Sequence, residues 1–170
     1  LKVYDIPQGG RATRGRAIVN LIGCDPGEKV EAFVSVKDFD DDHYIVMATK
    51  KGSVKKTVLS AYGKPRKGGI YAIEIRDGDK LIEARITNGE HDILLGTYEG
   101  KSIRFSEGNI RPSGRKTMGV RGIRLSSKED YLIGMLVVKR EGTILVATEK
   151  GLGKTTDVIQ YRTQTRRGKR

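Results

Sequence analysis

The chain has 170 residues, which at roughly 150 residues per domain predicts one compact unit or one array of small repeats. It carries 33 Lys and Arg residues against 21 Asp and Glu residues, a formal net charge of +12, and no apolar run reaches the roughly 20 residues that a membrane-spanning helix requires. One cysteine, Cys24, excludes a disulfide framework and a cysteine-rich metal site. These features favour a soluble, intracellular, basic protein. The 22 glycines with no tryptophan favour an all-β chain with many tight turns.

Three sequence patterns recur along the chain in the same order. The first begins at a glycine and occurs at residues 15–21, 69–75 and 119–125. The second is a short apolar segment at residues 30–32, 81–84 and 131–134. The third is an apolar run followed by a small residue, threonine, two polar residues and glycine, at residues 45–52, 93–100 and 144–151. Since chance similarity would not keep this order three times, we infer repeats of about 50 residues, with reference glycines at Gly15, Gly69, Gly119 and Gly168.

Each pattern predicts β-strands, because the apolar runs are short, rich in Ile, Val and Leu, and bounded by Gly, Asp or Asn. The Thr-x-x-Gly step after each long apolar run predicts a hairpin turn, and residues 77–79 and 88–89 predict further turns. A period of about 50 residues with roughly four strands matches one blade of a propeller. The expected fold is therefore all-β and propeller-like, with residues 1–170 forming part of one domain. Both ends fall within a repeat, and about three blades do not close a ring of four to eight, so we expect a longer parent polypeptide.

The positive charge is concentrated in the segments that link each hairpin to the next reference glycine, residues 2–16, 55–67, 104–116 and 154–170. These segments hold 19 of the 33 basic residues but only 3 of the 21 acidic ones. Because repeats place equivalent positions on the same side of an array, the charges are expected to form a continuous stripe. A stripe that spans several blades fits a polyanion such as a phosphate backbone.

Double-stranded DNA is favoured over single strands, because the basic segments hold only four aromatic residues on which unpaired bases could stack. An acidic protein or an anionic membrane surface are the alternatives that the charge leaves open. The candidate DNA-binding residues are Arg11, Arg14, Arg16, Lys55, Lys56, Lys64, Arg66, Lys67, Arg104, Arg111, Arg115, Lys116, Lys154, Arg162, Arg166, Arg167, Lys169 and Arg170.

Catalytic and metal-binding patterns fail when they are tested one by one. Residues 151–155 hint at a phosphate-binding loop, but its first glycine is missing and no helix is expected to follow. His43 and His91 lack a second ligand at metal spacing and are interpreted as surface residues. The acidic residues at 38–42 lack the glycine and distal glutamate of a calcium loop. We therefore expect no catalytic residue, no metal and no cofactor in this chain.

Four motifs carry a resemblance to a known family: residues 2–7 (KVYDIP), 14–21 (RGRAIVNL), 52–57 (GSVKKT) and 119–125 (GVRGIRL). They resemble the C-terminal domain of the A subunit of bacterial DNA gyrase, a type IIA DNA topoisomerase. The resemblance implies a β-pinwheel, a disc of four-stranded blades that exchange strands, with duplex DNA wrapped around a basic outer rim. It also implies a parent isomerase that introduces negative supercoils. Its cleavage tyrosine, ATP site and Mg site would lie outside this domain, and its partners in an A2B2 complex would be the gyrase B subunit together with the rest of the A subunit.

The same resemblance implies a bacterial, cytoplasmic, nucleoid-associated protein, or one in an organelle of bacterial origin. Residues 164–170 are similar to the basic heptapeptide box of DNA gyrase, with an inserted threonine and only one of its paired glycines. The related C-terminal domain of the topoisomerase IV A subunit is the nearest alternative. A propeller enzyme with a central site and a protein-interaction propeller are the remaining ones, but the repeats share no carboxylates or histidines and their linking segments are Lys, Arg and Gly.

Overall fold

The computed structural model describes residues 1–24, 27–66 and 68–166. Its strands are β1 (Tyr44–Thr49), β2 (Ser53–Val58), β3 (Leu81–Thr87), β4 (Asp92–Thr97), β5 (Ser102–Ser106), β6 (Val120–Arg121), β7 (Leu132–Val138), β8 (Thr143–Ala147) and β9 (Gly153–Asp157). They form three sheets with the strand orders β3-β1-β2-β6, β5-β4-β7 and β8-β9. Helical structure in the described residues is limited to the single turn α1 (Val19–Ile22) and to 3-10 helices at Val3–Asp5, Leu59–Tyr62, Glu107–Asn109 and Val158–Gln160. The prediction of an all-β chain is confirmed.

The three predicted hairpins are β1–β2, β4–β5 and β8–β9, each an antiparallel pair. Their turns end on Gly52, Gly100 and Gly151, whose φ angles of 81°, 80° and 82° lie in the left-handed region that favours glycine. In every turn the glycine N–H donates to the carbonyl of the preceding threonine, at 2.9, 3.0 and 3.0 Å. The repeated Thr-x-x-Gly step therefore encodes one turn geometry three times.

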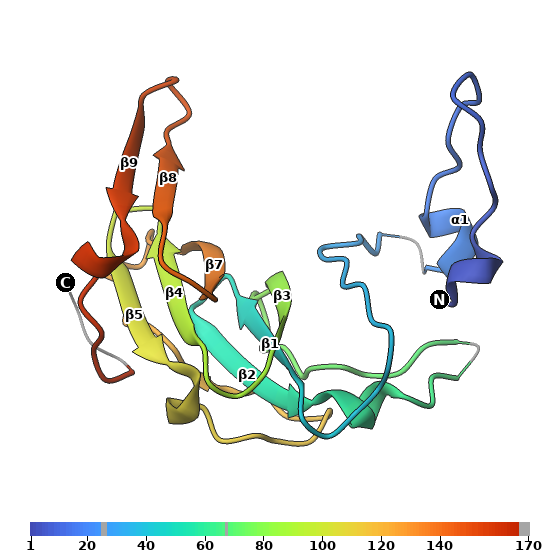
Figure 1. Cartoon of the computed structure of the whole chain (residues 1–170), viewed down its shortest axis with the longest axis horizontal. Helices are drawn as coiled ribbons and strands as arrows, with labels where there is room; N and C mark the ends of the chain where they lie inside the picture. Colours follow the sequence, from blue (N-terminus) through green and yellow to red (C-terminus); the bar gives the residue numbers. More distant parts are fainter. Residues whose placement is uncertain (25–26, 67, 167–170) are drawn as a thin grey trace.

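Neighbouring blades exchange a strand. β6 follows β5 in the chain but pairs with β2 of the preceding blade, with Val120 opposite Val54. The residues between β5 and β6 thus run back along β2, and the Ser113 N–H donates to the Lys56 carbonyl at 2.9 Å. One repeat later, the Gln164 N–H donates to the Arg104 carbonyl at 2.8 Å. β2 and β5 lie along one side of the curved array, while β3 and β7 lie along the other (Figure 1). The linking segments that carry the basic residues therefore run on the side of β2 and β5, which we call the outer edge.

The hydrophobic core lies between the first two sheets. Its fully buried members come from both hairpins and from the exchanged segment: Val46, Ala48, Val54, Ile93, Leu95, Ile103, Phe105, Ile110, Ile123, Leu132 and Met135. A Cβ atom added at Gly122 would lie 2.7 Å from Val54 Cγ1 and 2.8 Å from Leu95 Cδ1. The exchanged segment can therefore reach the core only because residue 122 has no side chain.

Two predicted strands are absent. Residues 15–21 form α1 and its approach instead of a strand, and residues 30–36, which by the repeat correspond to β3 and β7, have no strand either. β3 and β7 each pair with the first strand of the hairpin that precedes them, and the equivalent hairpin for residues 30–36 would fall before residue 1. Without that partner the backbone has no ladder to join, and Phe33 is 70% exposed. No helix in the described part of the chain is long and apolar enough to cross a membrane.

Candidate nucleic-acid interface

Most candidate residues that the structure describes reach solvent. Nine are exposed: Arg11, Arg14, Arg16, Lys64, Arg66, Arg111, Lys116, Lys154 and Arg162. Three more, Arg104, Arg115 and Arg166, are partly exposed. Lys67, Arg167, Lys169 and Arg170 lie outside the described residues, and so does most of the segment similar to the heptapeptide box.

The basic linking segments of successive repeats lie against one another. The Glu74 N–H donates to the Thr117 carbonyl at 3.0 Å, which joins the end of the first linking segment to the end of the second. The Lys116 ammonium lies 5.4 Å from the centre of the Tyr71 ring. The third segment contacts the second through Arg166, whose guanidinium donates to the carbonyls of Arg121 at 2.7 Å and of Asn109 at 3.2 Å. These contacts bring cations from three repeats onto one surface of the outer edge.

Two arginines on this surface were missed by the sequence reasoning. Arg121 on β6 and Arg124 directly after it are both exposed. The count of charged residues ended at residue 116, where the linking segment stops, whereas the exchanged strand continues along the outer edge. The alternation of residues 119–125 between glycine or apolar residues and arginine is the signal that would have found them.

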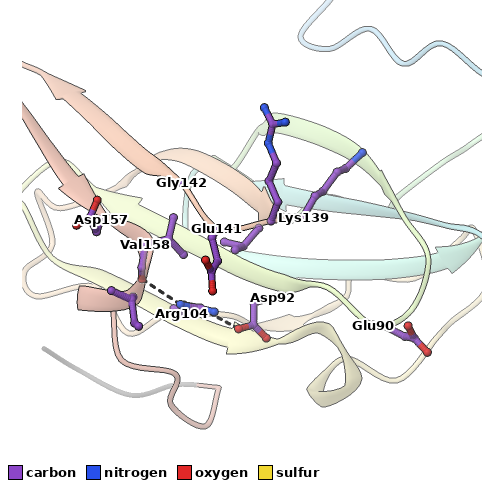
Figure 2. Close-up of a pocket in the computed structure, with 11 residues that line it drawn as sticks. Glu90, Asp92, Arg104, Lys139, Glu141, Gly142, Asp157 and Val158 are labelled. Carbon is purple, nitrogen blue, oxygen red and sulfur yellow. Dashed lines mark hydrogen bonds and ion pairs between the residues drawn. The ribbon is translucent and has the colours of Figure 1, made fainter.

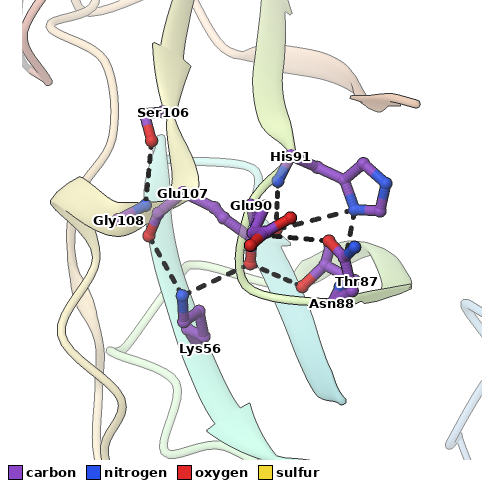
Figure 3. A network of polar contacts seen from close by, with 8 residues as sticks. All are labelled: Lys56, Thr87, Asn88, Glu90, His91, Ser106, Glu107 and Gly108. Carbon is purple, nitrogen blue, oxygen red and sulfur yellow. Dashed lines mark hydrogen bonds and ion pairs between the residues drawn. The ribbon is translucent and has the colours of Figure 1, made fainter. Parts of the chain in front are cut away.

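Lys56 is a correction to the set of candidate residues, because it is 4% exposed and cannot face DNA directly. Its ammonium contacts Glu107 Oε2 and the Glu107 carbonyl, both at 3.3 Å. The Glu107 carboxylate is itself fully buried and accepts hydrogen bonds from the Thr87 hydroxyl at 2.6 Å and the His91 N–H at 2.8 Å. Figure 3 shows this network, which links β2 and β3 of one blade to the hairpin of the next. The local sequence predicts an exposed lysine at this position, but here the lysine pairs with a buried acid.

Lys55 is a second correction, with 0% exposure. Its ammonium donates to the carbonyl of Ala72 at 2.6 Å and to the carbonyl of Arg115. Residues 110–120 cover this part of β2, and a Cβ atom added at Gly119 would lie only 2.9 Å from Lys55 Cβ. The strand exchange therefore buries a side chain that would otherwise lie on the outer face of β2.

Arg104 is the third correction, because its guanidinium is engaged within the protein. Its Nε donates to Asp92 Oδ2 at 2.8 Å, and its Nη1 donates to the Val158 carbonyl at 3.0 Å. These contacts lie in a cavity of about 710 Å³ between the second and third hairpins, lined by both acidic and basic side chains (Figure 2). Arg104 thus fastens one hairpin to the next, and its charge is neutralised by Asp92.

The remaining polar groups considered in the sequence take part in turn structure. His43 Nδ1 lies 2.9 Å from Asp40 Oδ2, and this hydrogen bond lowers the pKa of the Asp40 carboxyl. His91 is less exposed than expected for a surface residue, because its ring packs beside Glu107, with 3.7 Å between Nδ1 and Oε1. No cluster of three or more His, Cys, Asp or Glu side chains in the described ranges could hold a metal ion.

The geometry defines a class of protein: a repeat protein of strand-exchanging β-blades with cations gathered along its outer edge. The family profile described as the DNA gyrase C-terminal domain, beta-propeller, matches residues 1–37, 43–88, 91–139 and 142–170. The chain belongs to this family, and the predicted resemblance and propeller-like fold are confirmed.

Relatives and solved structures agree with this assignment. The chain is 45% identical over 170 residues to the A subunit of DNA gyrase from Chlamydia muridarum (strain MoPn / Nigg), covering 99% of this chain and 20% of the relative. It is 42% identical over 166 residues to the A subunit of DNA gyrase from Escherichia coli (strain K12), covering 98% and 19%. The chain thus spans about a fifth of the length of these curated relatives.

Two solved structures share the fold. The crystal structure of the C-terminal domain of DNA topoisomerase IV superposes with a TM-score of 0.88 at 27% identity, covering 97% of this chain and 51% of that one. The DNA gyrase A C-terminal domain superposes with a TM-score of 0.79 at 24% identity, covering 91% and 51%, a similarity that supports the fold alone.

Proposed function

We propose that this chain binds duplex DNA along its outer edge and bends it there, as the DNA-wrapping module of a DNA gyrase A subunit. The observation that carries the proposal is the joining of cationic linking segments from successive repeats through contacts such as Glu74 to Thr117 and Arg166 to Arg121. The exposed cations of this edge in residues 63–166 are Lys64, Arg66, Arg111, Lys116, Arg121, Arg124 and Arg162.

The physical mechanism is neutralisation of phosphates by an array that follows a curved edge. Each Lys or Arg that contacts a phosphate releases condensed counterions, which makes the affinity strongly dependent on salt. A duplex that follows several blades must bend, and bending 20–30 base pairs by 40–90° costs about 1–6 kcal/mol. Contacts from further blades offset this cost. The sequence preference is therefore weak and reflects how easily a given duplex deforms.

At the level of the parent protein, the proposal is an ATP-dependent type II topoisomerase, an isomerase that introduces negative supercoils. Its ATP and Mg would be bound outside this chain. The partners would be double-stranded DNA and, in an A2B2 complex, the gyrase B subunit together with the remainder of the A subunit, in the bacterial cytoplasm. The identity of 45% to a DNA gyrase A subunit over nearly the whole chain supports this assignment.

The C-terminal domain of the topoisomerase IV A subunit is the second candidate. The specific observation in its favour is the TM-score of 0.88 to the solved domain of DNA topoisomerase IV, together with 27% identity. On this alternative the same outer edge holds DNA without wrapping it.

A topology assay separates the two. The chain is bound to nicked circular DNA, the nick is ligated, and the change in linking number is measured after removal of the protein. A positive shift that grows with the amount of protein is expected for chiral wrapping. Binding that is sensitive to salt but leaves the linking number unchanged would favour the topoisomerase IV alternative. Affinity that barely changes with salt would overturn DNA binding itself, because six phosphate contacts predict a log–log slope of about −5.

A further inference from the structure

Lys55 is a buried cation without an acidic partner. Its side chain is fully buried, and both of its hydrogen bonds go to backbone carbonyls, those of Ala72 and Arg115. Among the described residues, no carboxylate lies within ion-pair distance of its ammonium. Burying an unpaired charge is costly, so the cost must be offset by what the two hydrogen bonds accomplish.

The two carbonyls belong to separate linking segments of the outer edge. Ala72 lies just after the segment that carries Lys64 and Arg66, and Arg115 lies within the segment that carries Arg111 and Lys116. Neither stretch, residues 70–75 or 111–117, is part of a strand. The Lys55 ammonium therefore connects two stretches that also meet through the backbone hydrogen bond from Glu74 to Thr117. The Tyr62 hydroxyl strengthens the same point by donating to the Ala72 carbonyl at 3.2 Å.

The next blade shows that packing alone does not require a lysine here. Lys55 lies opposite Met47 in the first hairpin, and Ile103 lies opposite Leu95 at the same register position of the second. Ile103 is also buried, at 1% exposure. An apolar side chain thus satisfies this position in one blade. What Lys55 adds in the other is a positive charge and two donated hydrogen bonds.

We propose that Lys55 is a positioning residue for DNA binding, whose buried ammonium holds the two linking segments together and so places the cations of residues 111–116 beside those of residues 64–66. The proposal rests on the proposed function of the outer edge. It assigns Lys55 an indirect role, since a phosphate cannot reach a side chain that is fully buried.

The protonation state of Lys55 gives this role a measurable signature. Burial lowers the pKa of Lys55 to about 8, and the positive charge of Arg115 acts in the same direction. The groups that face it are Arg115 and Tyr62, whose hydroxyl pKa is raised by burial. At pH 7 the ammonium is charged and the connection is complete. Above about pH 8 the neutral amine donates weaker hydrogen bonds, so the segments separate more readily and DNA affinity falls.

The experiment measures the dissociation constant of a fluorescent duplex, at about 0.1 M salt and roughly pH 6.5 to 9.5, for the wild-type chain and for Lys55→Met. Each phosphate contact contributes about 0.9 to the salt slope, so loss of one or two contacts weakens binding roughly tenfold or more at this salt. The wild type should lose this affinity between about pH 7 and 9. Lys55→Met should already have the weakened affinity at pH 7 and show no further fall. Lys154→Met is the matched control, because Lys154 occupies the same register position in the third hairpin but is exposed, and it should keep the wild-type pH profile.

A third variant keeps the test decisive if Lys55→Met unfolds. Lys55→Arg retains a cation throughout this pH range and should bind DNA at pH 9 as well as at pH 7. A folded Lys55→Met with wild-type affinity and an unchanged pH profile overturns the proposal, and so does a Lys55→Arg chain whose affinity falls with pH as the wild type does. If the wild type binds DNA without salt dependence at pH 7, the proposed function fails instead.

Discussion

Charge reversal at Lys64 and Lys116 tests whether the outer edge is the DNA-binding surface. Both side chains are exposed, and they belong to linking segments of successive repeats. If each contacts one phosphate, Lys64→Glu with Lys116→Glu should reduce the salt slope by about 1.8 and weaken binding roughly 60-fold at about 0.1 M salt, before repulsion is added. The loss should be the same for unrelated duplex sequences, because backbone phosphates carry no base information. Stability should change by less than about 0.5 kcal/mol, as is usual for exposed surface positions.

The matched control is Lys80→Glu with Lys139→Glu, which changes the net charge of the chain by the same amount. Lys80 and Lys139 are also exposed but lie outside the linking segments. Fluorescence anisotropy of a duplex of about 40 base pairs, titrated over a range of salt concentrations, gives the affinity and the slope for both double variants. The control should lose only the small affinity expected from the change in net charge. Equal losses for the two double variants would refute the reasoning, because they would mean that net charge and not its placement drives binding.

Three further predictions concern stability. Lys56→Met alone should destabilise the fold by about 3–5 kcal/mol because Glu107 would remain buried without its cation, and adding Glu107→Leu should recover most of that loss, since Leu59 and Val158 occupy the equivalent position in the other repeats; urea unfolding measures both. Gly119→Ala should prevent the close approach of the exchanged strand, because its Cβ would lie 2.5 Å from the Val54 carbonyl at a φ of 75°, and a loss of thermal stability of several degrees or more would be absent if the strand is not exchanged in solution. The free energy of unfolding should rise as pH increases from about 8 toward 10, because the unfolded chain still binds the proton that Lys55, with its pKa lowered from 10.5 to about 8 by burial, has released in the native state; Lys55→Met should remove this rise in denaturant midpoints.

The local pattern of the sequence predicted those elements whose hydrogen-bonding partners are close in the chain. The three hairpins form as expected, since each strand meets its neighbour across one turn and Gly52, Gly100 and Gly151 supply the turn geometry. The concentration of charge in the linking segments could also be counted directly from the repeats. Together with the family motifs, these features were sufficient to predict a propeller-like, basic, strand-repeating domain.

The environment of individual basic residues could not be predicted in this way. Lys55, Lys56 and Arg104 belong to the same charged segments as Lys64 and Lys116, yet their partners come from residues far away in the sequence, such as Ala72, Glu107 and Val158. Residues 15–21 and 30–36 have the composition of strands but no partner to pair with. In each case the outcome depends on an exchanged or neighbouring strand, not on the local residues.

Composition, repeat period and turn residues thus determined the fold class, the hairpins and the location of the charge along the chain, because these depend on interactions between near neighbours. Only the tertiary structure decided which cations face solvent and which hold the blades together. The physical reason is that strand exchange covers part of the outer face of β2, and a lysine enclosed there must find a carbonyl or a carboxylate to offset its desolvation.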